Sequence, residues 1–338
     1  MIYTLQWICN LLYPPIKLLV VATLLAMLVG CEKPVKPLQI GNNVWPGYEP
    51  AYLARSLGYL DKLPVRLVEY SSTTQVLAAF QNGLIQSAFL TLDEVILLRS
   101  RGFRAQIILV VDESNGADAI VGRPPMSTIQ DIKGRRVGVE DSASGAFMLL
   151  KVLKAASLQL SDIETVSVEI DQHERAYREG RVDAVVTFEP VRSRLLTQGA
   201  TVLFNSSQIP GEIIDVLAVD EGAWEEQRDT LLKVAEAWFR ASDFLRTQPE
   251  DAMRRIGMRL RLDPQALRKS YQGIRLLTIE DNLGMLRGSP SKLDQAAISY
   301  WKLMAEHGLL SDVGDVKTGL KDLVDPSVVE AIKAGGAQ

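Results

Sequence analysis

The chain has 338 residues, of which 47% are apolar, and a formal net charge of −4 at pH 7. This length supplies a large hydrophobic core, organised as one large domain or two smaller ones. The mild negative charge and the lack of a basic run argue against a nucleic-acid partner.

The N-terminal segment has the pattern of a bacterial export signal. An apolar run over 18–29 follows Lys17 and is too short to cross a bilayer. It ends at Cys31 in the sequence LVGC, which resembles the lipobox whose cysteine is lipidated and becomes the first mature residue. We expect a signal peptide over 1–30, a lipid on Cys31 and a polar tether over 31–37. A simple membrane anchor with a chance cysteine is the alternative.

Removal of residues 1–30 takes away one lysine and no acid, so the mature charge is −4 − 1 = −5 over 308 residues. Cys9 leaves with that segment, and Cys31 is then the one remaining cysteine. We therefore expect neither a disulfide nor thiol chemistry in the mature protein, although its compartment would permit a disulfide.

Apolar periodicity and capping residues predict strands alternating with helices along the first part of the chain. Predicted strands cover 38–44, 65–70, 87–90, 105–111 and 118–121, and predicted helices cover 50–57, 71–82 and 91–100. The helix at 91–100 opens on a capping box, Thr91 to Glu94.

The pattern restarts after the prolines at 124–125. Strands are predicted at 135–139, 165–170, 183–187, 201–204 and 213–219, and helices at 147–153, 171–180 and 188–199. From Ala223 onward the period is helical, with breaks at Pro249, Pro264 and 288–290.

Strands alternating with helices predict an α/β fold, and the restart predicts two sheets. Ligands of such sheets lie beyond the carboxyl ends of the strands, where helices begin. Helix starts near Pro50, Ser72, Ser144 and Pro190 fall on both sides of the restart, which predicts a cleft between two lobes.

The segment 134–156 shows this arrangement most clearly. A short strand leads into the polar turn 141–145, and a helix with Phe147 on its apolar face follows. Unpaired N–H groups at such a helix start, with the hydroxyls of Ser142 and Ser144, suit a ligand. Plain helix capping is the alternative.

The ordered set of segments resembles the substrate-binding proteins of ABC importers for nitrate, sulfonates and taurine, a family that includes binders of thiamine pyrimidine precursors. The resemblance covers nearly the whole mature chain, and no single motif is specific. Its segments are VWPGYEPAYLARSLGYLD, SSTTQVLAAFQNGLIQSA, SNGADAIVG, DIKGRRVGVEDSASGAFML, YREGRVDAVVTFEPVRSRL, IIDVLAV and the helical tail.

The resemblance implies a type II periplasmic-binding-protein-like fold with a helical C-terminal part. Its two crossovers would lie near 121–124 and 215–219, giving one lobe of residues 38–122 plus 219–338 and another of 123–218. Such lobes close over a small-molecule ligand by hinge motion, and the closed monomer docks on a membrane permease.

The candidate ligand-binding residues lie at predicted strand ends and helix starts. Trp45 and Tyr48 occupy a loop and would form a stacking wall, or would simply pack over the sheet edge. The remaining candidates, for each of which capping or turn chemistry is the alternative, are Ser72, Thr73, Asp93, Ser114, Asn115, Ser142, Ser144, Gly145, Glu189 and Asp215.

Acidic residues gather near the predicted strand ends. They are Glu49, Asp93, Asp112, Glu140, Asp141, Glu189 and Asp215. Several carboxylates in one cleft would repel nitrate or a plain alkyl sulfonate. Their placement favours a ligand of cationic or amine character, either a taurine-like zwitterion or a nitrogen heterocycle.

Catalysis finds little support in the sequence. Neither His173 nor His307 has a partner at metal-ligand spacing, and no nucleophile or phosphate-loop motif is present. We expect a non-enzymatic, cofactor-free solute-binding protein on the periplasmic or cell-surface side of a bacterial membrane. A ligand-sensing subunit of a membrane sensor kinase is the alternative, and an enzyme of pyrimidine-precursor synthesis is a more distant one.

Overall fold

The computed structural model of the protein describes residues 36–141, 143–310 and 314–336. Residues Pro37–Gln338 form one compact unit. The predicted signal peptide, Cys31 and most of the tether lie outside the described residues. Within the described part of the chain, no helix combines the length and apolar character needed to cross a bilayer.

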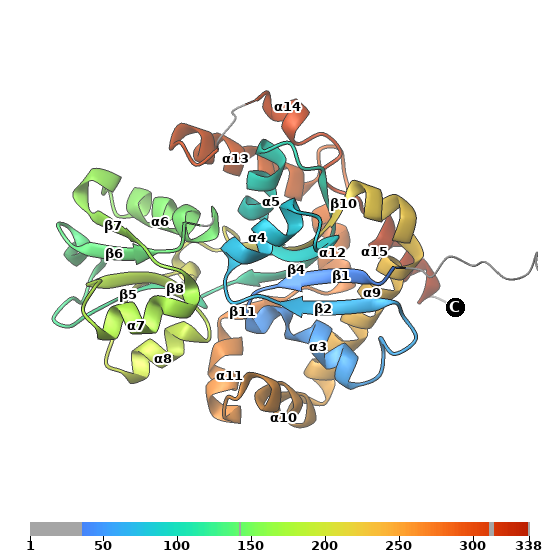
Figure 1. Ribbon diagram of the computed structural model, residues 1–338, viewed down its shortest axis with the longest axis horizontal. Helices are drawn as coiled ribbons and strands as arrows, with labels where there is room; N and C mark the ends of the chain where they lie inside the picture. The colour runs from blue at the N-terminus through green and yellow to red at the C-terminus, as the bar shows by residue number, and fades with distance from the viewer. Residues whose placement is uncertain (1–35, 142, 311–313, 337–338) are drawn as a thin grey trace, which may run out of the picture. The chain divides into compact units, whose positions relative to one another are not determined.

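The first sheet has six strands in the order β11-β4-β10-β3-β1-β2. Figure 1 shows the parallel strands β1 and β2 side by side in this sheet. Strand β1 pairs in parallel with β2 and β3, whereas β10 lies antiparallel between β3 and β4. The strands are β1 (Leu38–Asn42), β2 (Val65–Glu69), β3 (Ser87–Thr91), β4 (Ala105–Ser114), β10 (Ile214–Asp220) and β11 (Ile274–Leu276).

The second sheet repeats this plan with five strands in the order β7-β6-β8-β5-β9. Strand β6 is parallel to β7 and β8, and β5 lies antiparallel between β8 and β9. The strands are β5 (Asp118–Gly122), β6 (Arg136–Val139), β7 (Glu164–Ser167), β8 (Ala184–Phe188) and β9 (Thr201–Asn205). The restart predicted from the sequence is therefore a second sheet built in the same strand order.

Helices follow the parallel strands, as expected where both faces of a sheet are covered. The first sheet carries α3 (Glu49–Ser56), α4 (Thr73–Gln81) and α5 (Leu92–Ser100), and the second carries α6 (Ala143–Ala155), α7 (His173–Arg178) and α8 (Val191–Thr197). The helical tail consists of α9 (Glu221–Thr247), α10 (Pro249–Leu260), α11 (Pro264–Gln272), α12 (Ile279–Leu286), α13 (Lys292–Glu306), α14 (Val316–Gly319) and α15 (Ser327–Gly335).

We call β1–β4, β10, β11, α3–α5 and α9–α15 the first-sheet lobe, and β5–β9 with α6–α8 the second-sheet lobe. Strands β3 and β5 are buried along their whole length, because helices or neighbouring strands cover every side. In the tail, α9 buries Leu231, Val234 and Trp238 on one face, as its helical period predicts. The expected two-lobed α/β fold with a helical C-terminal part is confirmed.

The strand pairings place the crossovers differently from our expectation. Strand β5 pairs in the second sheet, so the first crossover is the segment 115–117 rather than 121–124. The return occurs between β9 and β10, before Ile214 rather than within 215–219. The central antiparallel strand of each sheet follows directly on a crossover, and alternation in the sequence does not show which sheet such a strand joins.

Strand β11 was not expected either, because everything after Ala223 has a helical period. It contains three residues and pairs with the outer edge of β4. A strand of this length carries too little alternation to be recognised from sequence.

Candidate functional site

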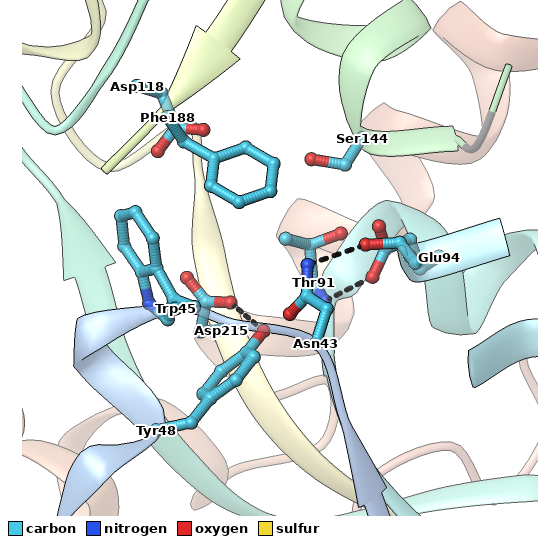
Figure 2. A pocket seen from close by; sticks show the side chains of 10 residues that line it. Asn43, Trp45, Tyr48, Thr91, Glu94, Asp118, Ser144, Phe188 and Asp215 are labelled. Atoms are coloured by element: carbon cyan, nitrogen blue, oxygen red, sulfur yellow. Dashed lines mark hydrogen bonds between the residues drawn. The ribbon is translucent and has the colours of Figure 1, made fainter. Parts of the chain in front are cut away.

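A small cavity lies where strand ends of both sheets meet (Figure 2). Its volume, measured as the space open to the centre of a water molecule, is about 20 Å³. That space suits about one water molecule, so a larger solute requires the lobes to move apart. The cavity is lined by Asn43, Trp45, Tyr48, Thr73, Thr91, Glu94, Asp118, Ser144, Phe188 and Asp215.

Aromatic rings from both lobes form one side of this cavity. Trp45 of the first-sheet lobe meets Phe188, at the end of β8, edge to face with ring centroids 5.7 Å apart. Tyr48 stacks on Phe89 of β3 at 5.2 Å, and Phe89 packs against Trp238 at 5.3 Å. The cavity wall is thus continuous with the core of the first-sheet lobe, which holds Tyr48 in a fixed orientation.

Two carboxyl groups face each other across neighbouring strands at the base of the site. Asp215 of β10 and Asp112 of β4 are cross-strand partners, and both are buried. The hydroxyl of Tyr48 donates to Asp215 (Figure 2), and the indole Nε1 of Trp45 donates to Oδ2 of Asp112 at 3.2 Å. Like charges directly opposite each other destabilise a sheet, so this pair needs protons or a cation.

The pKa of Asp112 is raised to about 7, mainly by burial and in smaller part by the charge of Asp118, while the hydrogen bond from Trp45 lowers it. Burial also raises the pKa of Asp215 well above its ordinary value, and the charge of Asp112 adds to that effect. The same two causes, burial and then Asp215, raise the pKa of the Tyr48 hydroxyl, which therefore stays a donor.

A second acidic group lies at the start of α5. Glu94 closes the capping box by accepting the Thr91 N–H at 2.9 Å through Oε2. Its other oxygen, one oxygen of Asp93 and the Thr91 hydroxyl are buried without a hydrogen-bond partner among the described residues. Burial raises the pKa of Asp93 to about 7 and, together with Asp93, raises that of Glu94 well above normal.

A smaller chamber of about 10 Å³ adjoins the main cavity inside the second-sheet lobe and shares Asp118, Ser144 and Phe188 with it. Burial raises the pKa of Asp118 to about 6. The chamber also contains His173, whose pKa burial lowers to about 4, so this imidazole is neutral near pH 7. His173 contacts Thr187 Oγ1 at 3.2 Å and the Val168 carbonyl at 3.0 Å, which account for both ring nitrogens.

The site as a whole is acidic, although the charge of Arg192, which is ion-paired with Glu189, also acts on Asp118 and lowers its pKa. In the part of the chain that the structure describes, none of its six buried carboxyl groups has a Lys, Arg or His nitrogen within 4.0 Å, and no Lys or Arg lines either chamber. Glu94, Asp118 and Asp215 line the main cavity, Glu140 lines the smaller chamber, and the buried Asp93 and Asp112 lie next to lining residues without lining either chamber. Within the described ranges, no group of three or more His, Cys, Asp or Glu side chains is arranged to hold a metal ion.

Of the predicted site residues, the structure brings Trp45, Tyr48, Thr73, Ser144 and Asp215 to the main cavity. Gly145 lines the smaller chamber, where a Cβ would lie 2.8 Å from the Glu140 carbonyl oxygen. Ser142 lies outside the described residues.

Other predicted residues have structural partners instead. Ser72 caps α4 by accepting the Gln75 N–H, and the Ser114 hydroxyl bonds the Ser206 hydroxyl at 2.8 Å. Asn115 is exposed. For Ser72, the hydrogen bond to Gln75 is the helix-capping role that we named as the alternative.

Two predicted acids are also outside the cavity lining. Glu189 is buried but ion-paired with Arg192 at 2.9 Å, and Ser193 and Ser270 donate to it as well. Asp93 is buried beside the lining residue Glu94 rather than lining the cavity itself.

Sequence reasoning missed five lining residues. Thr91 and Glu94 were recognised, but as a capping box, and the two roles coexist here. Asn43 directly follows β1, a position where a ligand contact could have been proposed. Asp118 and Phe188 sit within strands β5 and β8, and only the antiparallel pairing of these strands brings both to the cavity.

Comparison with known proteins gives a consistent result. A family model described as NMT1-like matches residues 32–258. A protein of Escherichia coli (strain K12) named for binding aliphatic sulfonates is 30% identical over 96 residues, which cover 28% of this chain and 27% of that protein. The match therefore spans about a quarter of the length of this curated relative.

Solved structures share the fold over most of their length. The alkanesulfonate-binding protein of Xanthomonas axonopodis pv. citri bound to MOPS has a TM-score of 0.73 at 17% identity, covering 84% of this chain and 97% of that one. The nitrate-binding protein of Synechocystis PCC 6803 has a TM-score of 0.72 at 11% identity, covering 89% of each chain. At these identities the similarity concerns the fold.

Proposed function

This chain belongs to the NMT1-like family, and we propose that it is the extracytoplasmic solute-binding protein of an ABC importer. The resemblance to nitrate, sulfonate and taurine binders that the sequence suggested is confirmed by the family match and the shared fold. A cavity between two lobes is the arrangement from which such proteins capture a solute by closing.

We infer further that the solute carries a protonated amine or a nitrogen heterocycle. The observation that carries this inference is the set of six buried carboxyl groups without a cationic partner among the described residues. A cation bound at Asp215, which lines the cavity, would relieve its repulsion with Asp112 and replace the protons that burial makes this pair retain. A nitrate or plain sulfonate at the same place would add a further negative charge.

The rest of the cavity suits a small, partly polar molecule. The rings of Trp45 and Phe188 offer apolar and cation–π contacts to a heterocycle or an ammonium group. Ser144, in the first turn of α6, offers a hydroxyl near a helix N-terminus. A taurine-like zwitterion would direct its amine to Asp215 and its sulfonate toward Ser144.

The lipid anchor is part of the same proposal and rests on the sequence. Lipidation of Cys31 would leave a short tether before β1, which begins at Leu38. The protein would then act as a monomer held at the periplasmic or cell-surface side of a bacterial membrane. Replacing Cys31 with Ser should move the protein from the membrane fraction to the soluble fraction, and an unchanged distribution would contradict the anchor.

A ligand panel tests the binding function. The protein, purified in mild detergent as the expressing cell produces it, is heated with taurine, alkanesulfonates, nitrate, simple amines, thiamine pyrimidines and flavins at pH 8. A ligand present at 100 times its Kd should add about 2.7 kcal/mol of stability and raise the melting temperature. Stabilisation by nitrate or plain sulfonates, with none by amines or heterocycles, would contradict the cationic ligand.

A further inference from the structure

Helix α4 begins at the cleft, and its first turn carries a set of hydrogen-bond donors. It has nine residues, Thr73–Gln81, and the Ser72 hydroxyl accepts the Gln75 N–H at 3.3 Å. The first N–H groups of a helix lack intrahelical partners and, with the helix dipole, attract anions. Thr73 lines the main cavity, and its hydroxyl accepts the Asn43 side-chain amide at 2.8 Å.

A carboxyl group of the other lobe already occupies this helix start. Glu140 follows β6 of the second-sheet lobe, and its Oε1 accepts the Thr74 N–H at 2.9 Å and the Thr74 hydroxyl at 3.1 Å. The side chain is 3% exposed. Glu140 therefore occupies the α4 N-terminus where an oxyanion ligand would bind. Burial raises its pKa to about 7 and the hydrogen bond from the Thr74 N–H lowers it, so the group is mainly a carboxylate at pH 8.

Packing around Glu140 leaves this residue little freedom. A Cβ on Gly145 would lie 2.8 Å from the Glu140 carbonyl oxygen and 3.3 Å from its nitrogen, so the start of α6 closely covers the backbone. The side chain lines the smaller chamber beside the neutral His173. Among the described residues, no cationic side chain is ion-paired with Glu140, so none draws its carboxyl group away from α4.

We propose that Glu140 is a specificity-determining residue, whose carboxylate fills the anion site at the α4 N-terminus when the lobes close and so excludes oxyanion ligands from it. The proposal rests on the proposed function, because it assumes that the cleft captures a small solute. It explains how a fold shared with sulfonate-binding and nitrate-binding proteins can reject anions at a helix start suited to them.

The test uses three probes with one carbon skeleton: ethylamine, taurine and ethanesulfonate. Isothermal titration at pH 8 compares the wild-type protein, in the form that the cell produces, with Glu140→Ala and Glu140→Gln. Asp141→Asn is the matched control, since it removes one negative charge at the adjacent, exposed residue.

We expect Glu140→Ala to bind ethanesulfonate at least tenfold more tightly than the wild type. Glu140→Gln should fall between them, because its amide oxygen can still accept the Thr74 N–H but carries no charge. Asp141→Asn should match the wild type. If Glu140→Ala does not fold, Glu140→Gln alone should still gain ethanesulfonate affinity, and the Thr74 amide resonance should shift on addition of that probe.

An unchanged or weaker affinity for ethanesulfonate in the folded Glu140 variants, or an equal gain in Asp141→Asn, would overturn the role of Glu140. The affinity of the wild-type protein for ethylamine tests the proposed function separately. A wild type that prefers ethanesulfonate to ethylamine contradicts the cationic ligand, whatever the variants do.

Discussion

Ionisation of the buried Asp112 should make the protein less stable as pH rises, and Asp112→Asn should remove that loss. Burial raises the pKa of this carboxyl from its ordinary 3.8 to about 7 in the folded protein. Its stabilising contribution is therefore complete below pH 3.8 and is lost as the pH rises through 7. Over this interval, at about 1.4 kcal/mol for each tenfold change in the ionisation constant, the loss is about 4 kcal/mol.

Asparagine keeps the shape of the protonated acid and cannot ionise. Relative to the wild type, Asp112→Asn should therefore gain about 4 kcal/mol of unfolding free energy between pH 4 and pH 8. The comparison between two pH values cancels the fixed cost of exchanging a hydroxyl for an amide. Removing the charge of Asp112 also lowers the pKa of Asp215 toward its ordinary value, and this too reduces the loss of stability as the pH rises.

Urea denaturation followed by tryptophan fluorescence, at pH 4, 5, 6, 7 and 8, measures this difference. The exposed Asp61, replaced by Asn, is the control and should show a pH-independent change within about 0.5 kcal/mol. If the curves of Asp112→Asn and the wild type stay parallel to within about 1 kcal/mol, Asp112 ionises normally in the folded protein and the reasoning about the cleft is wrong.

Three further outcomes are expected. Affinity for ethylamine should rise from pH 5 to pH 8, because the carboxyl groups must release protons before they bind a cation. Calorimetry in buffers of different ionisation enthalpy measures this proton release. An affinity that does not change with pH would contradict the prediction. Gly145→Ala should destabilise the protein by about 1–3 kcal/mol, because the new methyl group lies 2.8 Å from a backbone oxygen. Gly284→Ala, where the methyl group enters open space on a helix, should stabilise the protein slightly. Equal melting temperatures for the two variants would contradict this prediction. Arg259→Ala should lower the unfolding free energy by about 3–5 kcal/mol, because it leaves the buried Glu49 without its ion-pair partner. Arg254→Ala, which removes an exposed ion pair, should lower it by less than about 1 kcal/mol. Similar denaturation midpoints for the two variants would refute this difference.

Much of the fold could be predicted because its signals are local. Strand–helix alternation and the restart after 124–125 were sufficient to predict two sheets. The expected crossovers differ from the observed ones because β5 follows β4 closely in the sequence and was assigned to the first sheet. Its hydrogen-bonded partners, β8 and β9, come later in the chain. Which sheet a strand joins is a non-local property.

The candidate site was predictable where strand ends carry unusual residues, as at Trp45 and Tyr48. The pairing of Tyr48 with Asp215 joins residues 167 positions apart, and no local pattern predicts it. Placement alone also cannot tell a neutralised acid from a free one. Glu189 has its own arginine, whereas Asp215 has none among the described residues, and only the structure distinguishes them.

The antiparallel strand at the centre of each sheet has a consequence for the order of folding. Strands β5 to β9 occupy the continuous stretch 118–205, so the second-sheet lobe has all of its strands as soon as that stretch has emerged. The first-sheet lobe has a gap between β3 and β4 that is filled only by β10, Ile214–Asp220. The first-sheet lobe is therefore synthesised first but its sheet is completed last. The facing edges of β3 and β4 can pair only after β10 has been synthesised, and β10 follows every strand of the second sheet in the chain.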